Sequence, residues 1–274
     1  MNALAQWTFD PGVVMALTAS GILYALGLAD LWAKERSRGV RVWEASCFWI
    51  GWTSAGIALL SPIHALSESV FFMHMTQHEI LILVAAPLIV LGKPAMVSLK
   101  ALPQNSAGTM ARMAQEPAIA RIWAIVNAPL GAWLLHSAAL WLWHIPSVFD
   151  ATLHNNAIHA AQHISFFGSA ILFWWAILHG RQRRLSYGLG VLYMFTTAMH
   201  SGLLGALLTL SRSVWYPSYI HHNAFNLTPL EDQQLGGLIM WIPAGLIYVI
   251  AGLGFLAGWM REAEARVMRA QAAT

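Results

Sequence analysis

Two histidines four residues apart stand at the start of a long apolar stretch. The segment reads Phe71-Phe-Met-His-Met-Thr-Gln-His-Glu79 and leads into apolar residues up to Pro87. On an α-helix, positions i and i+4 share a face, so the rings of His74 and His78 point the same way. Ionisable groups in lipid are costly and usually face a cavity, a partner or a ligand. Because imidazole binds copper, zinc, iron and nickel, the pair predicts a metal site.

The rest of the chain offers histidine and methionine but almost no thiol. A second pair with the same spacing is His159 and His163, and the sequence holds 12 histidines, 12 methionines and one cysteine. The single cysteine, Cys47, excludes a disulfide framework and a Cys-x-x-Cys motif. Thioether ligands favour Cu(I). Copper therefore fits the available ligands best, and haem with axial histidines is the alternative.

The composition indicates that membrane helices must position these residues. The chain has 274 residues, of which 58% are hydrophobic and 10% charged, whereas soluble domains have about 25% charged residues. A span needs about 20 mostly apolar residues, and no basic leader precedes the first apolar stretch, which we expect to remain as a span. The sequence predicts an all-α polytopic membrane protein, a bundle of seven transmembrane helices that forms a single domain over residues 1–274. The predicted spans are Val13–Trp32, Trp43–Leu60, Val70–Leu91, Ile122–Trp143, Ala157–Leu178, Gly188–Leu210 and Leu235–Trp259.

The basic residues predict how the bundle is oriented. Of the 15 Lys and Arg residues, all except Arg212 fall in the connections after the first, third and fifth spans or after the seventh. Cytoplasmic connections carry the excess of Lys and Arg, so the N-terminus is predicted outside and the C-terminus in the cytoplasm. The same distribution explains the net positive charge without a nucleic-acid partner. We expect one interfacial helix, around Ala107–Gln115, in the longest cytoplasmic connection.

The predicted topology places histidines of four spans at a similar depth. With a rise of about 1.5 Å per residue, each lies within about 15 Å of the outer end of its span. These residues are His74 and His78 in the third span, His136 in the fourth, His159 and His163 in the fifth, and His200 in the sixth. Metal sites in helical bundles are commonly built from inward-facing side chains of neighbouring helices. We therefore expect the four spans to share one site that faces the outer side.

Each candidate residue has an expected role in this site. The expected ligands are His74, His78, His163 and His200, with His136 and His159 as alternate ligands or as residues that support the ligands. The residues expected to bind the metal transiently are Met73, Met75 and Met199, and those expected to collect it at the rim are His64, His144, His221 and His222. The residues expected to orient ligating histidines are Gln77, Glu79 and His144. Glu79 could equally relay protons or make a structural hydrogen bond.

Other functions fit parts of this pattern. A single histidine in a membrane helix is more often an interhelical hydrogen-bond partner than a ligand, and a metal-free scaffold would need nothing more. A membrane cytochrome or haem-handling protein would use axial histidines on facing helices, but haem propionates favour basic partners, and the outer side offers only Arg212. A transporter is a weaker alternative, because the predicted spans contain few charged residues and the sequence shows no internal repeat.

Several short motifs occur in order between about Ala16 and Trp259. They are His74-Met-Thr-Gln-His78, Pro87-Leu-Ile-Val-Leu-Gly92, His136, Trp141-Leu-Trp-His144-Ile-Pro146, His159-Ala-Ala-Gln-His163, His200-Ser-Gly-Leu-Leu-Gly-Ala-Leu-Leu-Thr209, Trp215-Tyr-Pro217, Asp232-Gln-Gln-Leu-Gly-Gly237 and Met240-Trp241. Together they resemble the CtaG-type cytochrome c oxidase assembly factors of the seven-span kind.

This resemblance implies a role in respiratory chain biogenesis in the bacterial cytoplasmic (inner) membrane. It implies a metallochaperone that delivers copper to the binuclear centre of a haem-copper oxidase, with oxidase subunit I as the expected partner. A periplasmic copper donor and a homodimer are further candidate partners, besides the lipid bilayer. Delivery by ligand exchange makes no covalent bond, so we do not expect an enzyme. With Cys47 as the only thiol, histidine and methionine must handle the copper.

Overall fold

The computed structural model describes residues 6–34, 39–179, 186–220 and 224–272. These residues form helices and no strand, which confirms the all-α prediction. The main elements are α1 (Pro11–Lys34), α2 (Val42–Leu60), α3 (Pro62–Ser67), α4 (Phe71–Glu79), a π-helical segment (Ile80–Ala85), α5 (Ala86–Leu91), α6 (Pro94–Ala101), α7 (Gln104–Gln115), α8 (Pro117–Val126), α9 (Pro129–Trp143), α10 (Pro146–His154), α11 (Asn156–Leu178), α12 (Tyr187–Leu210) and α13 (Pro229–Gln271).

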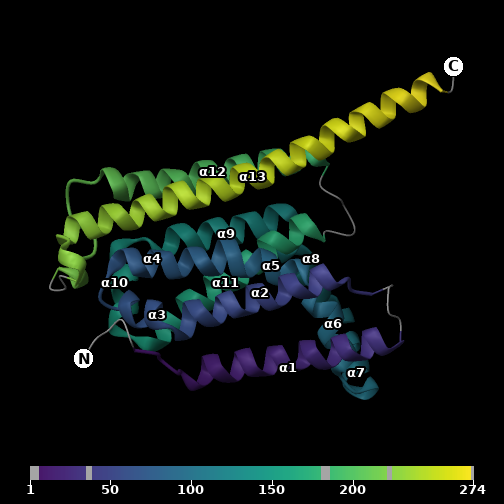
Figure 1. Ribbon diagram of the computed structural model, residues 1–274, viewed down its shortest axis with the longest axis horizontal. Helices are drawn as coiled ribbons and strands as arrows, with labels where there is room; N and C mark the ends of the chain where they lie inside the picture. Colours follow the sequence, from purple (N-terminus) through teal and green to yellow (C-terminus); the bar gives the residue numbers. More distant parts are fainter. Residues whose placement is uncertain (1–5, 35–38, 180–185, 221–223, 273–274) are drawn as a thin grey trace.

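The long helices run along one common direction (Figure 1). Within the described residues, five helices are long and apolar enough to cross a membrane, or six if α8 and α9, bent by 71°, form one span. Helix α2 covers the predicted second span but is not among these candidates. The expected interfacial segment is helical as α7. The membrane-protein class is therefore supported, whereas the count of seven and the orientation of the termini stay predictions.

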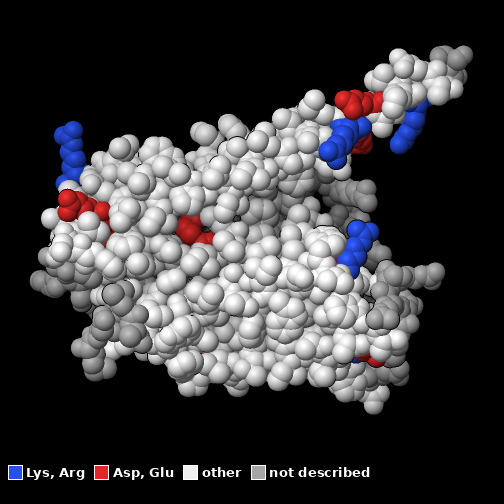
Figure 2. All heavy atoms as spheres, in the orientation of Figure 1, with Lys and Arg blue, Asp and Glu red and all other residues white. Residues whose placement is uncertain are grey.

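The surface of the bundle fits a lipid environment. Large apolar side chains such as Ile22, Leu203, Leu246 and Ile250 are more than half exposed, which in water would create extended hydrophobic patches. Figure 2 shows Lys and Arg side chains near the two ends of the visible face, with a broad uncharged belt between them that a small acidic patch interrupts. Figure 1 places α3 and α10 at the end near the N-terminus, and α6, α7 and the last turns of α13 at the other end.

Two adjacent glycines allow α13 to pack closely against two other helices. A Cβ at Gly237 would lie 2.8 Å from the carbonyl oxygen of Gly205 on α12, so the two backbones are in contact there. A Cβ at Gly236 would overlap the ring of Phe71, the first residue of α4. Small residues at helix interfaces permit such close approach in membranes. The Gly-Gly pair therefore connects α4, α12 and α13.

The π-helical segment accommodates the proline inside the third predicted span. Pro87 has no N–H, and its ring would clash with the preceding turn of a regular helix. The amide of Ala86 instead donates to the carbonyl of Leu81, five residues back. In this wider turn each carbonyl accepts from the amide five residues later in the chain. For Ile82 that residue is Pro87, which has no N–H, so the Ile82 carbonyl has no donor within the helix. The indole Nε1 of Trp174 on α11 donates to that carbonyl at 3.0 Å.

Trp174→Phe is expected to destabilise the bundle by about 1 to 3 kcal/mol, because it leaves a buried carbonyl without a donor. The midpoint of thermal unfolding in detergent should fall accordingly. Trp175→Phe is the matched control, since Trp175 is only partly buried and stacks on His179. Equal effects of the two substitutions would contradict the role of the indole hydrogen bond.

Candidate metal centre

Three of the predicted ligands lie together in the structure. His74 and His78 on α4 and His163 on α11 each offer a ring nitrogen, and these nitrogens all lie within 4.8 Å of one another. The ring centroids are 4.4 Å apart for His74 and His78 and 5.4 Å apart for His78 and His163. Imidazole nitrogens bind a first-row metal at about 2 Å, so small side-chain rotations would bring the three onto one ion. We call these residues the histidine triad.

The hydrogen bonds of the triad leave nitrogens free for a metal. Among the described residues, neither ring nitrogen of His78 has a hydrogen-bond partner, and the same holds for Nε2 of His163. Both residues are buried or nearly so. A buried polar atom without a partner costs about 1 to 3 kcal/mol. A metal ion between these nitrogens would remove that cost, so the donor set fits a bound cation.

His74 is held in a defined orientation by its neighbours. Its Nδ1 lies 3.3 Å from the carbonyl oxygen of Ser67 and 3.2 Å from the hydroxyl of Tyr219. Its Nε2 lies 3.3 Å from Oε1 of Gln162. Metal-binding histidines usually donate their other N–H to a carbonyl or carboxylate. With Nδ1–H donating to Ser67, Nε2 is the nitrogen that could bind a metal, and it would exchange its contact with the Gln162 amide for the ion.

Two further histidines, His159 and His64, lie next to the triad, toward one end of the bundle. We call these two and the triad the histidine cluster. The ring of His159 lies 5.4 Å from that of His74 and 4.4 Å from that of His163. The ring of His64, on α3, lies 5.7 Å from that of His159. Burial lowers the pKa of His64, although the nearby carboxylates of Glu68 and Asp10 oppose this shift. His64 is thus in contact with the cluster and not in a separate loop.

Gln77 contacts His64, which is not one of the predicted ligands, so the expected orienting roles of Gln77 and Glu79 stay predictions. The Gln77 amide Nε2 donates to the carbonyl of Ala58 at 2.8 Å and lies 2.9 Å from Nδ1 of His64. The Oε2 atom of Glu79 is buried and makes no hydrogen bond within the described parts of the chain. His221 and His222 lie outside the described residues.

His144 is close to the triad but separated from it by aromatic rings. Its Nδ1 donates to the carbonyl of Leu140 at 2.6 Å, and its Nε2 is buried without a partner in the described structure. Phe149 and Phe166 both pack against His144, and they also contact His74 and His78, respectively. His144 therefore lines the surroundings of the triad and does not belong to it.

The structure does not place the other two candidate histidines in the triad. Nδ1 of His136 lies 3.1 Å from the hydroxyl of Ser169, and its ring packs on Phe173. Nε2 of His200 lies 3.0 Å from the hydroxyl of Ser137. Each thus has a serine partner, between α9 and α11 for His136 and between α9 and α12 for His200. Depth alone does not bring them to the shared site.

The methionines differ in their surroundings. Met75 is fully buried in the hydrophobic core and faces Gly236. Met73 is half-buried. Met199 is 59% exposed and so points away from the bundle. Their role as transient ligands remains a prediction.

The structure also reveals a carboxylate that the sequence alone did not assign. Asp232 accepts hydrogen bonds from the backbone amides of Phe71 and Phe72, each at 2.8 Å. Residue Val70, at the start of α4, provides no side-chain cap, so Asp232 caps this helix from α13. The predicted seventh span begins only at Leu235, after Asp232, whereas α13 already begins at Pro229. The capping box formed by Thr228 and Glu231 was the sequence signal for this earlier helix start.

Two tyrosines of the segment before α13 close the cluster from the end of the bundle. The hydroxyl of Tyr219 donates to the carbonyl of Ser67 at 2.9 Å, and that of Tyr216 donates to the carbonyl of His144 at 3.1 Å. The Tyr216 ring stacks on Phe71 with centroids 4.8 Å apart. Hence Tyr216 and Tyr219 cover the site and contact the start of α4.

The helices and the triad together define the class: a polytopic helical membrane protein with buried histidines between two of its helices. A comparison with known families identifies it further. The chain belongs to the cytochrome c oxidase caa3 assembly factor family (CtaG), whose model matches residues 22–262. This match covers most of the chain and confirms the resemblance found in the sequence motifs.

The curated relatives include mycobacterial proteins. The chain is 27% identical to the uncharacterized protein Mb0105 of Mycobacterium bovis and to the uncharacterized protein MT0111 of Mycobacterium tuberculosis. In both cases the alignment covers 95% of this chain and 40% of the relative. The uncharacterized protein ML1998 of Mycobacterium leprae is 25% identical over 93% of this chain and 40% of its own length. The chain therefore spans less than half the length of these relatives. No solved structure matches.

Proposed function

We propose that this protein is a cytochrome c oxidase assembly factor that binds copper at the histidine triad and helps deliver it to the binuclear centre of the oxidase. Membership of the assembly-factor family supports the first part. The observation that carries the second is the group of three buried ring nitrogens within 4.8 Å, among them the unpartnered nitrogens of His78.

The ligand types favour a first-row transition metal such as copper over Mg²⁺, Ca²⁺ or haem. The triad offers imidazole and no carboxylate, whereas Mg²⁺ and Ca²⁺ prefer oxygen ligands. Cys47, the only thiol of the chain, lies on α2 and is not part of the triad. His78 packs against Phe166 with ring centroids 4.7 Å apart, and His74 packs against Phe149 at 4.9 Å. A haem would have to displace these rings, so a bare ion fits the site better.

The residues of the chain would bind and release copper without covalent chemistry. The carbonyl of Ser67 fixes the orientation of His74, and His159 is the neighbour best placed to supply a fourth nitrogen. Transfer to the oxidase would proceed by exchange of one histidine ligand for another. We therefore propose a metallochaperone and not an enzyme.

The membrane setting belongs to the same proposal. We place the protein in the bacterial inner membrane, with seven spans, the N-terminus and the triad toward the periplasm, and the C-terminus in the cytoplasm. The concentration of Lys and Arg in the connections that we assign to the cytoplasm supports this orientation. Oxidase subunit I is the proposed partner, with a periplasmic copper donor and a second copy of the chain as further candidates.

Metal analysis of the purified protein tests this function. We expect about one copper per chain after incubation with copper at pH 7.5 and removal of the excess, and no Soret band. Because a ligating imidazole must be neutral, protons compete with the metal, and the bound copper should be lost progressively as the pH is lowered. The measurement is mass spectrometry for metals, with an absorption spectrum of the same sample.

Two outcomes would contradict the proposal. A Soret band with no bound copper would favour a haem protein. A protein that binds neither, and whose triad variants still support oxidase assembly, would be a metal-free scaffold in which the histidines only join helices.

A further inference from the structure

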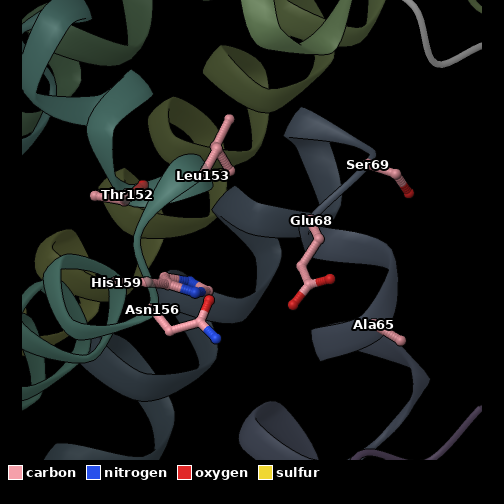
Figure 3. A pocket seen from close by; sticks show the side chains of 7 residues that line it. All are labelled: Ala65, Glu68, Ser69, Thr152, Leu153, Asn156 and His159. Atoms are coloured by element: carbon pink, nitrogen blue, oxygen red, sulfur yellow. The ribbon is translucent and has the colours of Figure 1, made fainter.

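A cavity of about 310 Å³ lies beside the histidine cluster, between α3, α10 and the start of α11. Glu68 lines it from the end of α3, and Asn156 and His159 line it from α11. Figure 3 shows the carboxylate of Glu68 and the ring of His159 extending into this space from different elements. The cavity is thus a polar recess at the end of the bundle that carries α3 and α10 (Figure 1).

His159 connects this cavity with the triad. Its ring is 4.4 Å from that of His163 and 5.4 Å from that of His74. Its Nε2 is buried and has no hydrogen-bond partner among the described residues. The same side chain therefore borders the cavity and touches two of the proposed ligands, so a cation could pass along it by short steps.

Glu68 provides the negative charge of the cavity. Its side chain is exposed, and in the described part of the chain it makes no hydrogen bond or ion pair. A carboxylate at the mouth of a recess raises the local concentration of cations and their rate of association. A carboxylate with an imidazole suits a first-row metal ion.

We propose that this cavity is the loading port of the triad, in which Glu68 first attracts a copper cation and His159 passes it to His163 by ligand exchange. This inference rests on the proposed copper site. It adds a route and assigns a function to Glu68. The triad determines how tightly copper is held, whereas the port determines how fast it arrives.

Rapid mixing separates these two properties. Metal-free protein in detergent is mixed with copper(II) sulfate at low ionic strength, and binding is followed by quenching of tryptophan fluorescence. We expect Glu68→Gln to slow association about 10-fold, with a weaker dependence on salt, and to leave the copper content at saturation unchanged. Asn156→Phe, which introduces a large ring at an exposed position of the cavity lining without adding a fluorescent tryptophan, should slow association and dissociation together.

The matched control is Glu231→Gln. It removes one negative charge outside the cavity, and glutamine also suits this position of the capping box. If wild type binds copper, and Glu68→Gln and Asn156→Phe load at the wild-type rate, the proposed loading port is wrong, whereas the proposed copper site is not contradicted. Equal slowing by Glu231→Gln would also overturn the port, because charge anywhere on this end would then suffice. If wild type binds no copper, the proposed function itself fails, and the port fails with it.

Discussion

His78→Leu is expected to reduce copper affinity at least about 100-fold without lowering thermal stability. Loss of residues that merely orient a ligand already costs about 10- to 100-fold in metal affinity, and His78 is proposed as a ligand. Both of its ring nitrogens are buried without partners in the described structure. Replacing such a group by an apolar side chain of similar size is close to neutral for stability or stabilising. Competition titration with a copper chelator and thermal unfolding in detergent measure the two effects.

The second readout distinguishes a ligand from a structural residue. If His78 joined helices by hydrogen bonds, leucine would destabilise the bundle and the copper content would be secondary. His154→Ala is the matched control, because His154 is exposed, contacts Ser218 and is not in the triad. Unchanged copper affinity in the His78 variant, with normal oxidase assembly in cells that carry it, would exclude the triad as the copper site.

Asp232→Ala should be the most destabilising of the single changes considered, by about 3 kcal/mol. It removes two hydrogen bonds of 2.8 Å and leaves the buried amide of Phe71 and the partly buried amide of Phe72 unpaired. A favourable interaction of the carboxylate with the N-terminal end of the helix dipole is lost as well. The midpoint of thermal unfolding measures the change, and copper affinity should fall in parallel, since His74 and His78 lie on the same helix.

A graded series would strengthen the interpretation of Asp232. Asp232→Asn keeps one acceptor oxygen and should therefore fall between wild type and the alanine variant. Glu231→Gln, the adjacent position, should have little effect because the capping box tolerates glutamine. An alanine variant as stable as wild type would show that α4 does not depend on this cap.

The pairing of histidines four residues apart on one helix was predictable from the sequence, because this geometry is local. The i, i+4 spacing of His74 and His78 predicted rings on one face, and the rings are 4.4 Å apart. The depth expected for His163 agreed with that of His78, and the two rings are in contact. Hydrophobic length and helical rise were sufficient for these predictions.

The positions of the other candidate residues depend on which helices are neighbours. They could not be predicted, because the depth of a residue along its span does not say which helices pack together. His200 was expected at the triad, yet its ring nitrogen lies beside Ser137, because α12 packs mainly along α13 and also contacts α9. Met199, one position earlier, is turned by about 100° and is exposed. His64 was expected at the rim, but the short helix α3 brings it into contact with His159. Such contacts follow from tertiary packing.

The motif Asp232-Gln-Gln-Leu-Gly-Gly237 has a mechanical consequence for the site. Asp232 and Gly236 are four residues apart and both contact α4, whereas Gly237 contacts α12. Any rotation or sliding of α13 would break the cap and both close contacts at once. Helices α4, α12 and α13 are thus expected to move as one rigid block that holds two of the three triad histidines. The third triad residue, His163, lies on α11, outside this block.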